Sequence, residues 1–320
     1  MIGPSANPVA ADAKRSGCRT VFCGTSEFAA AVLRRLADSP HRPALVVTPP
    51  DRRRGRGLKL GSPPAADAAR ELGLELAQTA DVNGPESLER IRAASPDAVA
   101  LCAFGQLVRE PLLSGFLLLN LHPSLLPRWR GAAPIARAIM AGDAETGVSV
   151  MRVTVGLDSG PVALQERTPI RPDEDWGSLS TRLAELGGEL LVRALDLHEA
   201  GELSFHEQDD SLATYAEKIA PEDRHLDPAC PAAELAATVR ALTPHVGAYL
   251  ELDGGGRLGV RSVMAEDGEL GVGELEMADA ELRLGCGDGV LRLAVVQPPG
   301  GRPMTVKEFL RGHDVPAAAR

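Results

Sequence analysis

The chain has 320 residues, more than a typical single domain holds, so we expect two domains. Apolar residues make up 44% of it, and the net charge of −10 argues against a surface built throughout for nucleic acid, although a local basic patch stays possible. The five cysteines show no zinc-ligand spacing, which suits a reducing compartment and the cytoplasm. No apolar run reaches the roughly 20 residues of a membrane helix. Residues 1–17 lack the apolar core of a secretory signal, and we expect a flexible N-terminal extension there.

The first half of the sequence alternates between strand and helix patterns, beginning with a buried-strand pattern at residues 19–24. Ser26 is a candidate N-cap for the first helix. The second helix has Pro63 or Pro64 at its start and Gly73 at its end. This alternation predicts a parallel α/β sheet with strands buried on both faces. Further strands are expected at residues 44–48, 97–103 and 116–122, and helices at 26–39, 63–73, 85–95 and 176–201.

A hairpin is predicted where two strand patterns, residues 147–153 and 161–168, flank a glycine-rich turn. We place the N-terminal domain at residues 18–203 and a polar linker at residues 204–221. Residues 222–320 contain one helix pattern followed by short apolar runs separated by turns, which predicts a small antiparallel barrel or sandwich.

Residues 48–65 read as a long irregular loop with an unusual concentration of positive charge. Four arginines and one lysine stand there against a single acid, Asp51: Arg52, Arg53, Arg54, Arg56 and Lys59. A solvated charge run is one interpretation. The other is a polyanion site, because like charges on one loop repel each other unless an anion binds, and RNA suits this local reversal of sign.

Asn120 and His122 lie two residues apart at the end of a predicted strand, so their side chains share one face. An amide donor beside an imidazole suits oxyanion stabilisation and proton transfer, although a structural polar pair would look the same. Asp158 lies in the turn "GLDSG", where it either caps an Asx-turn or faces and orients His122. The remaining histidines show no ligand spacing, so no metal is expected.

Taken together, several stretches resemble the methionyl-tRNA formyltransferase family. They include "FCGTSEFAAAVL", "TPPDRRRGRGLKL", "AFGQL", "NLHPSLLPRWRGAAPIARAIMAGDAETGVSVM" and "VGLDSGPV", and continue through "TYAEKI" to "GDGVLRLAVVQPPGGRPM". The resemblance covers about residues 18–313. It implies a Rossmann-like formyltransferase domain with a parallel-rich sheet, a linker, and a small C-terminal β-barrel resembling an OB-fold that binds tRNA.

The resemblance also implies formyl transfer from 10-formyltetrahydrofolate to the amino group of methionine on initiator methionyl-tRNA. We expect the protein to be a monomer. The family's catalytic residues correspond to Asn120, His122 and Asp158. Its arginine that reaches toward the tRNA acceptor end corresponds to Arg56. The segment that lines its folate site corresponds to Ser124, Leu125, Leu126 and Pro127.

Three other functions share parts of this pattern. A sugar-nucleotide N-formyltransferase would share the catalytic residues and folate loop, but the basic loop and C-terminal barrel favour tRNA. A 10-formyltetrahydrofolate hydrolase would use water in place of the amine, and no regulatory domain is apparent. A non-catalytic tRNA- or folate-binding protein would not need the Asn120, His122 and Asp158 combination.

Overall fold

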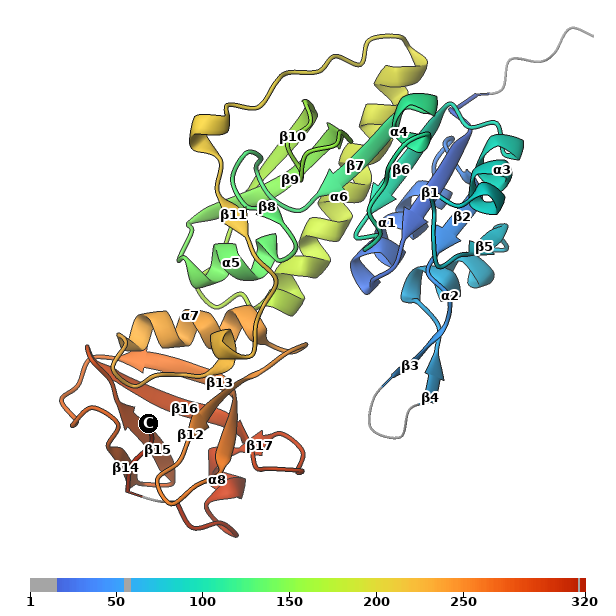
Figure 1. Ribbon diagram of the computed structural model, residues 1–320. Coiled ribbons are helices and arrows are strands. Elements are labelled where there is room, and N and C mark those ends of the chain that lie inside the picture. The colour runs from blue at the N-terminus through green and yellow to red at the C-terminus, as the bar shows by residue number, and fades with distance from the viewer. Residues whose placement is uncertain (1–15, 55–58, 316) are drawn as a thin grey trace, which may run out of the picture.

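The structure, a computed structural model, describes residues 16–54, 59–315 and 317–320. Over these ranges the chain forms two lobes, each with its own hydrophobic interior (Figure 1). The N-terminal lobe has a core on both faces of its central sheet, and the C-terminal lobe has one further core. No helix in the described part of the chain is long and apolar enough to cross a membrane.

The central sheet of the N-terminal lobe has seven strands in the order β10-β9-β7-β6-β1-β2-β5. The five strands from β7 to β5 run parallel, and β9 and β10 add an antiparallel pair at one edge. The strand bounds are Thr20–Gly24 (β1), Pro43–Thr48 (β2), Leu76–Gln78 (β5), Ala98–Cys102 (β6), Leu118–His122 (β7), Glu145–Arg152 (β9) and Val162–Pro169 (β10). The predicted parallel-rich sheet and the hairpin beside it are confirmed; β5 was not predicted.

Helices cover both faces of this sheet, which explains why its strands are apolar throughout. In β1, Phe22 packs on the face of the sheet that α6 covers, whereas Val21 and Cys23 pack on the opposite face. Ser26 accepts a hydrogen bond from the Ala29 amide, as its predicted capping role requires. The helices are Glu27–Ala37 (α1), Pro64–Glu71 (α2), Pro85–Ala93 (α3), Leu112–Gly115 (α4), Pro134–Met140 (α5) and Trp176–Glu199 (α6).

The C-terminal lobe is an antiparallel sheet with helix α7, Ala232–Leu242, packed against it. Its other elements are β12 (Ala248–Glu251), β13 (Arg257–Glu266), β14 (Leu275–Ala278), β15 (Glu281–Gly285), β16 (Val290–Gln297), β17 (Met304–Thr305) and α8 (Val306–Phe309). Residues 317–320 bridge the two edge strands: the Leu275 amide donates to the Ala317 carbonyl, and the Arg320 amide donates to the Glu251 carbonyl. These bonds close the sheet into the small barrel that the sequence predicted.

The segment between the lobes is mostly irregular, as predicted, but part of it is attached to the N-terminal lobe. Its short strand β11, Tyr215–Ala216, pairs in parallel with β8, Arg130–Gly131. Two 3-10 turns, Asp210–Leu212 and Glu222–Arg224, flank β11. The linker therefore contacts the loop that follows β7.

The basic segment differs from the prediction. In place of an irregular loop, β3 (Arg52–Arg54) and β4 (Lys59–Gly61) form an antiparallel hairpin that projects from the N-terminal lobe (Figure 1). Backbone hydrogen bonds pair the two strands, and neither strand needs an apolar face. The sequence therefore shows no alternation of apolar and polar residues here. Residues 55–58, including Arg56, lie outside the described residues.

Candidate active site

Asn120 and His122 project from the carboxyl end of β7, opposite the face that Leu119 and Leu121 bury in the core. Strand β7 lies between parallel β6 and antiparallel β9, so the strand direction changes beside it. Ligands of open α/β sheets bind at the carboxyl ends of their strands. The shared face predicted for the two side chains therefore opens where a ligand is expected.

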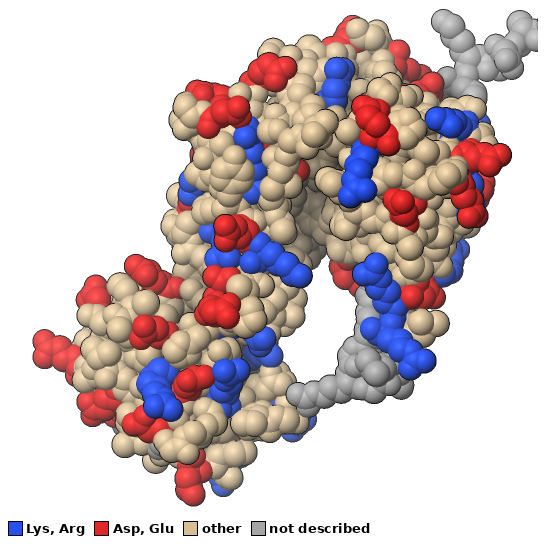
Figure 2. Space-filling view, viewed as in Figure 1, with Lys and Arg blue, Asp and Glu red and all other residues tan. Residues whose placement is uncertain are grey.

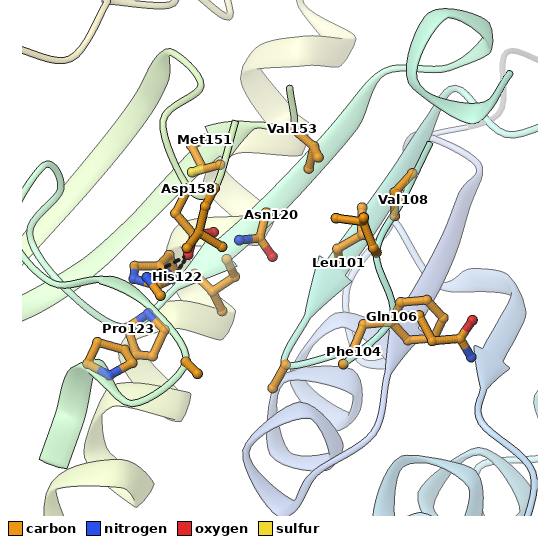
Figure 3. Close-up of a pocket in the computed structure, with 18 of the residues that line it drawn as sticks. Leu101, Phe104, Gln106, Val108, Asn120, His122, Pro123, Met151, Val153 and Asp158 are labelled. Atoms are coloured by element: carbon orange, nitrogen blue, oxygen red, sulfur yellow. Dashed lines mark hydrogen bonds and ion pairs between the residues drawn. The ribbon is translucent and has the colours of Figure 1, made fainter. Parts of the chain in front are cut away.

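Asp158 lies on the connection between β9 and β10 and faces His122 (Figure 3). Its Oδ2 atom is 3.7 Å from His122 Nδ1 and accepts a hydrogen bond of 2.9 Å from the Gly131 amide. Asp158 adopts a left-handed backbone conformation, with φ of 46°. Of the two roles that the sequence left open for Asp158, the geometry matches the one beside His122.

The hydrogen bonds of His122 define which ring nitrogen carries the proton. Its Nε2 atom is 2.8 Å from the carbonyl oxygen of Trp129. A carbonyl only accepts, so Nε2 must be the donor, and the neutral ring then has a lone pair on Nδ1. That lone pair lies on the side of Asp158. Neutral His122 is therefore suited to accept a proton at Nδ1, and it can donate from Nδ1 only afterwards.

A cavity of about 560 Å³ adjoins these groups. Asn120, His122 and Asp158 occupy one side of it, and the segment after β6 forms the other (Figure 3). Most of its wall is apolar, with contributions from Leu101, Phe104, Val108, Met151 and Val153. Among the described residues the Asn120 side chain forms no hydrogen bond, so its amide is available to a ligand.

The chemistry of the residues in "AFGQL" did not predict that this stretch forms an apolar cavity wall; the stretch only contributed to the family resemblance. The Gln106 side chain in this stretch forms hydrogen bonds to the backbone of a neighbouring segment. Its side chain accepts from the Val82 amide at 2.8 Å and donates to the Thr79 carbonyl at 2.9 Å. The glutamine thus fixes the position of Phe104 and Val108 on the cavity side of the loop.

Ser124, Leu125, Leu126 and Pro127 do not line this cavity. Ser124 is fully buried and donates to the Arg128 carbonyl at 2.6 Å, while the Leu126 amide donates to the Ser149 hydroxyl at 3.2 Å. Leu125 lines a smaller hollow of about 210 Å³ on another side of the loop. These contacts shape the loop between β7 and α5, and the folate-binding role of these four residues stays a prediction.

Among the described residues, one cluster has the residue types of a metal site. It consists of Cys18, His41 and Glu199, whose ligand atoms lie within 4.8 Å of one another. Both nitrogens of His41 are already used, because Nδ1 accepts from the Cys18 amide and Nε2 lies 2.9 Å from Asp196 Oδ1. Burial also raises the pKa of the Cys18 thiol to about 11, so it is not a thiolate at neutral pH. The cluster is therefore a poor fit to a metal ion.

The described arginines of the hairpin, Arg52 and Arg53, are exposed. Figure 2 shows basic side chains gathered on this arm. The charge is therefore carried on a projecting arm, away from the cavity wall.

Comparison with known proteins identifies the class. Residues 18–195 match the formyl transferase family, and residues 218–314 match the formyl transferase C-terminal domain. Two solved structures share the fold. HypX from Aquifex aeolicus in complex with tetrahydrofolic acid has a TM-score of 0.63 at 18% identity, over 93% of this chain and 48% of that one. An N-formyltransferase from Helicobacter canadensis, in complex with folinic acid and dTDP-3-aminofucose, has 0.62 at 15%, over 86% and 98%. The chain is a formyl transferase with a Rossmann-like N-terminal lobe.

Closer relatives narrow this class. A methionyl-tRNA formyltransferase from Rubrobacter xylanophilus is 45% identical over 94% of this chain and 99% of its own length. One from Methylococcus capsulatus is 43% identical over 92% and 97%. The chain belongs to the methionyl-tRNA formyltransferase family.

Proposed function

We propose that this chain transfers the formyl group of 10-formyltetrahydrofolate to the amino group of methionine on initiator methionyl-tRNA, at the site formed by Asn120, His122 and Asp158. The observation that carries this assignment is the Nδ1 atom of His122 facing Asp158 at 3.7 Å, beside a cavity in a formyl transferase fold. The product is formylmethionyl-tRNA for translation initiation.

The cavity suits the formyl donor. Its volume of about 560 Å³ falls within the range of small-molecule sites, which are mostly apolar with a few placed polar groups. The flat rings of the folate would lie between Phe104 and Val108 on one side and Met151 on the other, with the formyl group toward Asn120 and His122. Ser124 to Pro127 would then support the folate indirectly, by holding the loop.

The first chemical step is activation of the amine. The methionine amino group arrives as an ammonium ion and must lose a proton before it attacks. His122 Nδ1 accepts that proton, and the resulting imidazolium is stabilised by the Asp158 carboxylate. Burial of His122, which is 5% exposed, strengthens this attraction by excluding water.

The second step is attack on the formyl carbon. A bond forms from the amine nitrogen to that carbon, and the carbonyl electrons move to the formyl oxygen. The Asn120 amide and the imidazolium of His122 donate hydrogen bonds to this oxyanion, and each such donor is worth roughly 10²- to 10³-fold in rate. The carbonyl then re-forms as the bond to the folate nitrogen breaks. The leaving nitrogen takes a proton as the new amide nitrogen releases one.

The tRNA would be held by positive charge outside the cavity. Arg52 and Arg53 are exposed on the hairpin. We propose that Arg56, which follows them in the sequence, contacts the acceptor end of the tRNA. We divide the chain accordingly into a catalytic domain at residues 18–203, a linker at 204–221 and a tRNA-binding barrel at 222–320. We also propose that the protein acts as a monomer, in the cytoplasm, where initiator tRNA is charged.

A direct assay tests the function. Purified protein is incubated with 10-formyltetrahydrofolate and charged initiator tRNA, and the methionine released from the tRNA is analysed by mass spectrometry. We expect formylmethionine with wild type and none with His122→Ala. Formylation of a dTDP- or UDP-amino sugar in a parallel reaction, with none on methionyl-tRNA, would contradict the assignment in favour of a sugar acceptor.

A further inference from the structure

We propose that Asp143 is a positioning residue for His122. Acting through Trp129, it keeps the imidazole proton on Nε2, so that the Nδ1 lone pair stays available to the reacting amine. The inference rests on the proposed function for its catalytic meaning, but the proton's position is a property of the protein alone.

Trp129 provides the link to His122. Its carbonyl oxygen accepts the hydrogen bond from His122 Nε2 at 2.8 Å. The direction of this carbonyl depends on an unusual backbone conformation, because Trp129 has a φ of 61°, in the left-handed region. A bulky residue stays in that region only where its surroundings hold it.

Asp143 supplies much of that hold. Its carboxylate accepts from the Trp129 indole nitrogen at 2.7 Å, and from Nε and Nη2 of Arg128 at 2.8 and 2.5 Å. The Arg128 guanidinium also lies over the Trp129 ring, 4.5 Å from its centroid. The hydrogen bond with Asp143 raises the pKa of Arg128 above its ordinary value. One further contact, from the Trp129 amide to the Thr214 hydroxyl at 2.9 Å, comes from the linker.

Asp143 is itself fixed by the end of α5. The Asp143 amide donates to the Ala138 carbonyl at 3.1 Å, and Gly142 before it has a φ of 68°. This is the geometry of a Schellman helix end, in which glycine takes the left-handed position. The carboxylate is therefore anchored to a helix, and only 14% of the side chain is exposed.

The Trp129 carbonyl must be kept in place because Asp158 favours the opposite tautomer of His122. A carboxylate 3.7 Å from Nδ1 attracts a proton to Nδ1, which would give the opposite neutral tautomer. In that tautomer Nδ1 has no lone pair and cannot take a proton from the amine. The Trp129 carbonyl opposes this shift because it offers Nε2–H an acceptor. Once Trp129 is released from Asp143, its carbonyl turns and the proton moves to Nδ1.

Two variants separate this role from folding. Asp143→Ala removes the carboxylate, and Trp129→Phe removes the indole N–H and shortens the side chain while keeping an aromatic ring. The matched control is Glu145→Gln, which breaks an exposed ion pair with Arg167 beside the same hollow. The His122 ring is observed in each protein by ¹⁵N NMR without substrate, with His122→Gln used to assign its signals.

We expect the Nε2–H form in wild type and in Glu145→Gln, and a shift toward Nδ1–H in both Asp143→Ala and Trp129→Phe. The same two variants are expected to lose roughly 10- to 100-fold in kcat, with the KM for the formyl donor unchanged. An Nδ1–H form in wild type, or an unchanged tautomer in both variants, would overturn the inference. If wild type failed to formylate methionyl-tRNA while the tautomers shifted as expected, the proposed function would fail and the positioning role would stand.

Discussion

At the scale of single residues, the site depends on the orientation of the His122 ring, because its two nitrogens face different groups. His122 Nε2 is committed to the Trp129 carbonyl, and Nδ1 lies toward Asp158. Asp158 also accepts from the Gly131 amide, which holds its carboxylate in place. The charge of Asp158 and its position can therefore be tested separately.

Asp158→Asn tests the charge. Asparagine keeps an oxygen that can accept from the Gly131 amide, but it lacks the negative charge that stabilises the His122 imidazolium. We expect kcat for methionyl-tRNA formylation to fall roughly 100-fold or more, with no change in the thermal unfolding midpoint. A kcat equal to that of wild type would show that the carboxylate charge is not used.

Sequence spacing was sufficient to place Asn120 and His122 together, because residues two apart on a strand share a face. It was not sufficient for Asp158, since whether this residue meets His122 depends on how the β9–β10 connection folds back. Nothing in the sequence pointed to the Trp129 carbonyl, because a left-handed tryptophan is set by tertiary contacts and not by its neighbours.

At the scale of elements, strand β9 packs between β10 at the edge of the sheet and the loop that follows β7. Gly147 in β9 lies where a side chain has no room. A Cβ atom there would approach the Glu166 carbonyl oxygen of β10 to 2.1 Å and the Leu125 side chain to 2.6 Å. The glycine allows the hairpin and the loop that follows β7 to pack against each other.

Gly147→Ala is therefore expected to destabilise the protein by about 1–3 kcal/mol, because the backbone of β10 must move. Displacement of Leu125 should also lower formylation activity. Urea unfolding gives the free energy, with Gly115→Ala as the control, since a Cβ atom at Gly115 would have nothing within 4 Å and the φ of this residue is not positive. Equal stability of the two variants would contradict this role for Gly147.

The entry to α6 is fixed by a buried carboxylate. Glu174 accepts from Nε and Nη2 of Arg182 at 2.9 and 2.7 Å, and its own backbone carbonyl accepts from Arg240 of α7 at 3.0 Å. Burial acts to raise the pKa of Glu174, but the hydrogen bonds from Arg182 and from the Arg171 amide outweigh it and lower the pKa. The ionised form therefore stabilises the fold.

Glu174→Gln should cost about 1.5–3 kcal/mol at neutral pH, because hydrogen bonds to a charged group are lost. A carboxyl group with a lowered folded-state pKa contributes its full stabilisation above its ordinary value of 4.5. That contribution disappears as the pH falls through the lowered pKa. Urea unfolding of both proteins across this range should show the difference shrinking in acid, and a difference independent of pH would refute the interpretation.

Long elements were predictable and short ones were not. Helix α6 extends over many turns with a consistent apolar stripe, and its start carries a capping box between Asp175 and Ser178. By contrast, β5 has three residues and the hairpin strands β3 and β4 have three each, too few to show a period. In the hairpin, the consecutive arginines of β3 also favoured the interpretation as an irregular loop over a pair of strands.

At the scale of the whole molecule, the catalytic cavity lies in one lobe and the barrel in the other. Helix α7 of the C-terminal lobe packs against α5 of the N-terminal lobe and joins the two. Donor binding and tRNA binding should therefore respond to different parts of the chain.

Deletion of residues 317–320 tests this division. The deletion removes the backbone bonds that close the barrel between Glu251 and Leu275. We expect the C-terminal lobe to unfold at a lower temperature and the affinity for initiator tRNA to fall, while donor binding is retained. Calorimetry and filter binding check the two expectations, and an equal loss of donor binding would argue against separate roles for the lobes.

The sequence predicted a barrel from turn spacing, but not how it closes. Ala317 to Arg320 have no strand pattern, and their pairing with two edge strands arises only once the barrel has formed. The packing of α7 on α5 could not be predicted either, because an apolar stripe on a helix identifies the buried face but not the element that it packs against.

The most direct test of the central claim separates chemistry from binding in Asn120→Ala and His122→Ala. Each protein is saturated with the formyl donor, mixed with excess methionyl-tRNA, and followed through a single turnover; donor affinity is measured by calorimetry. We expect the rate of formyl transfer to fall by roughly 10²- to 10³-fold in each variant, with donor affinity unchanged. A wild-type rate in either variant, or a loss of donor affinity that accounts for the slower rate, would contradict the assignment of these residues to catalysis.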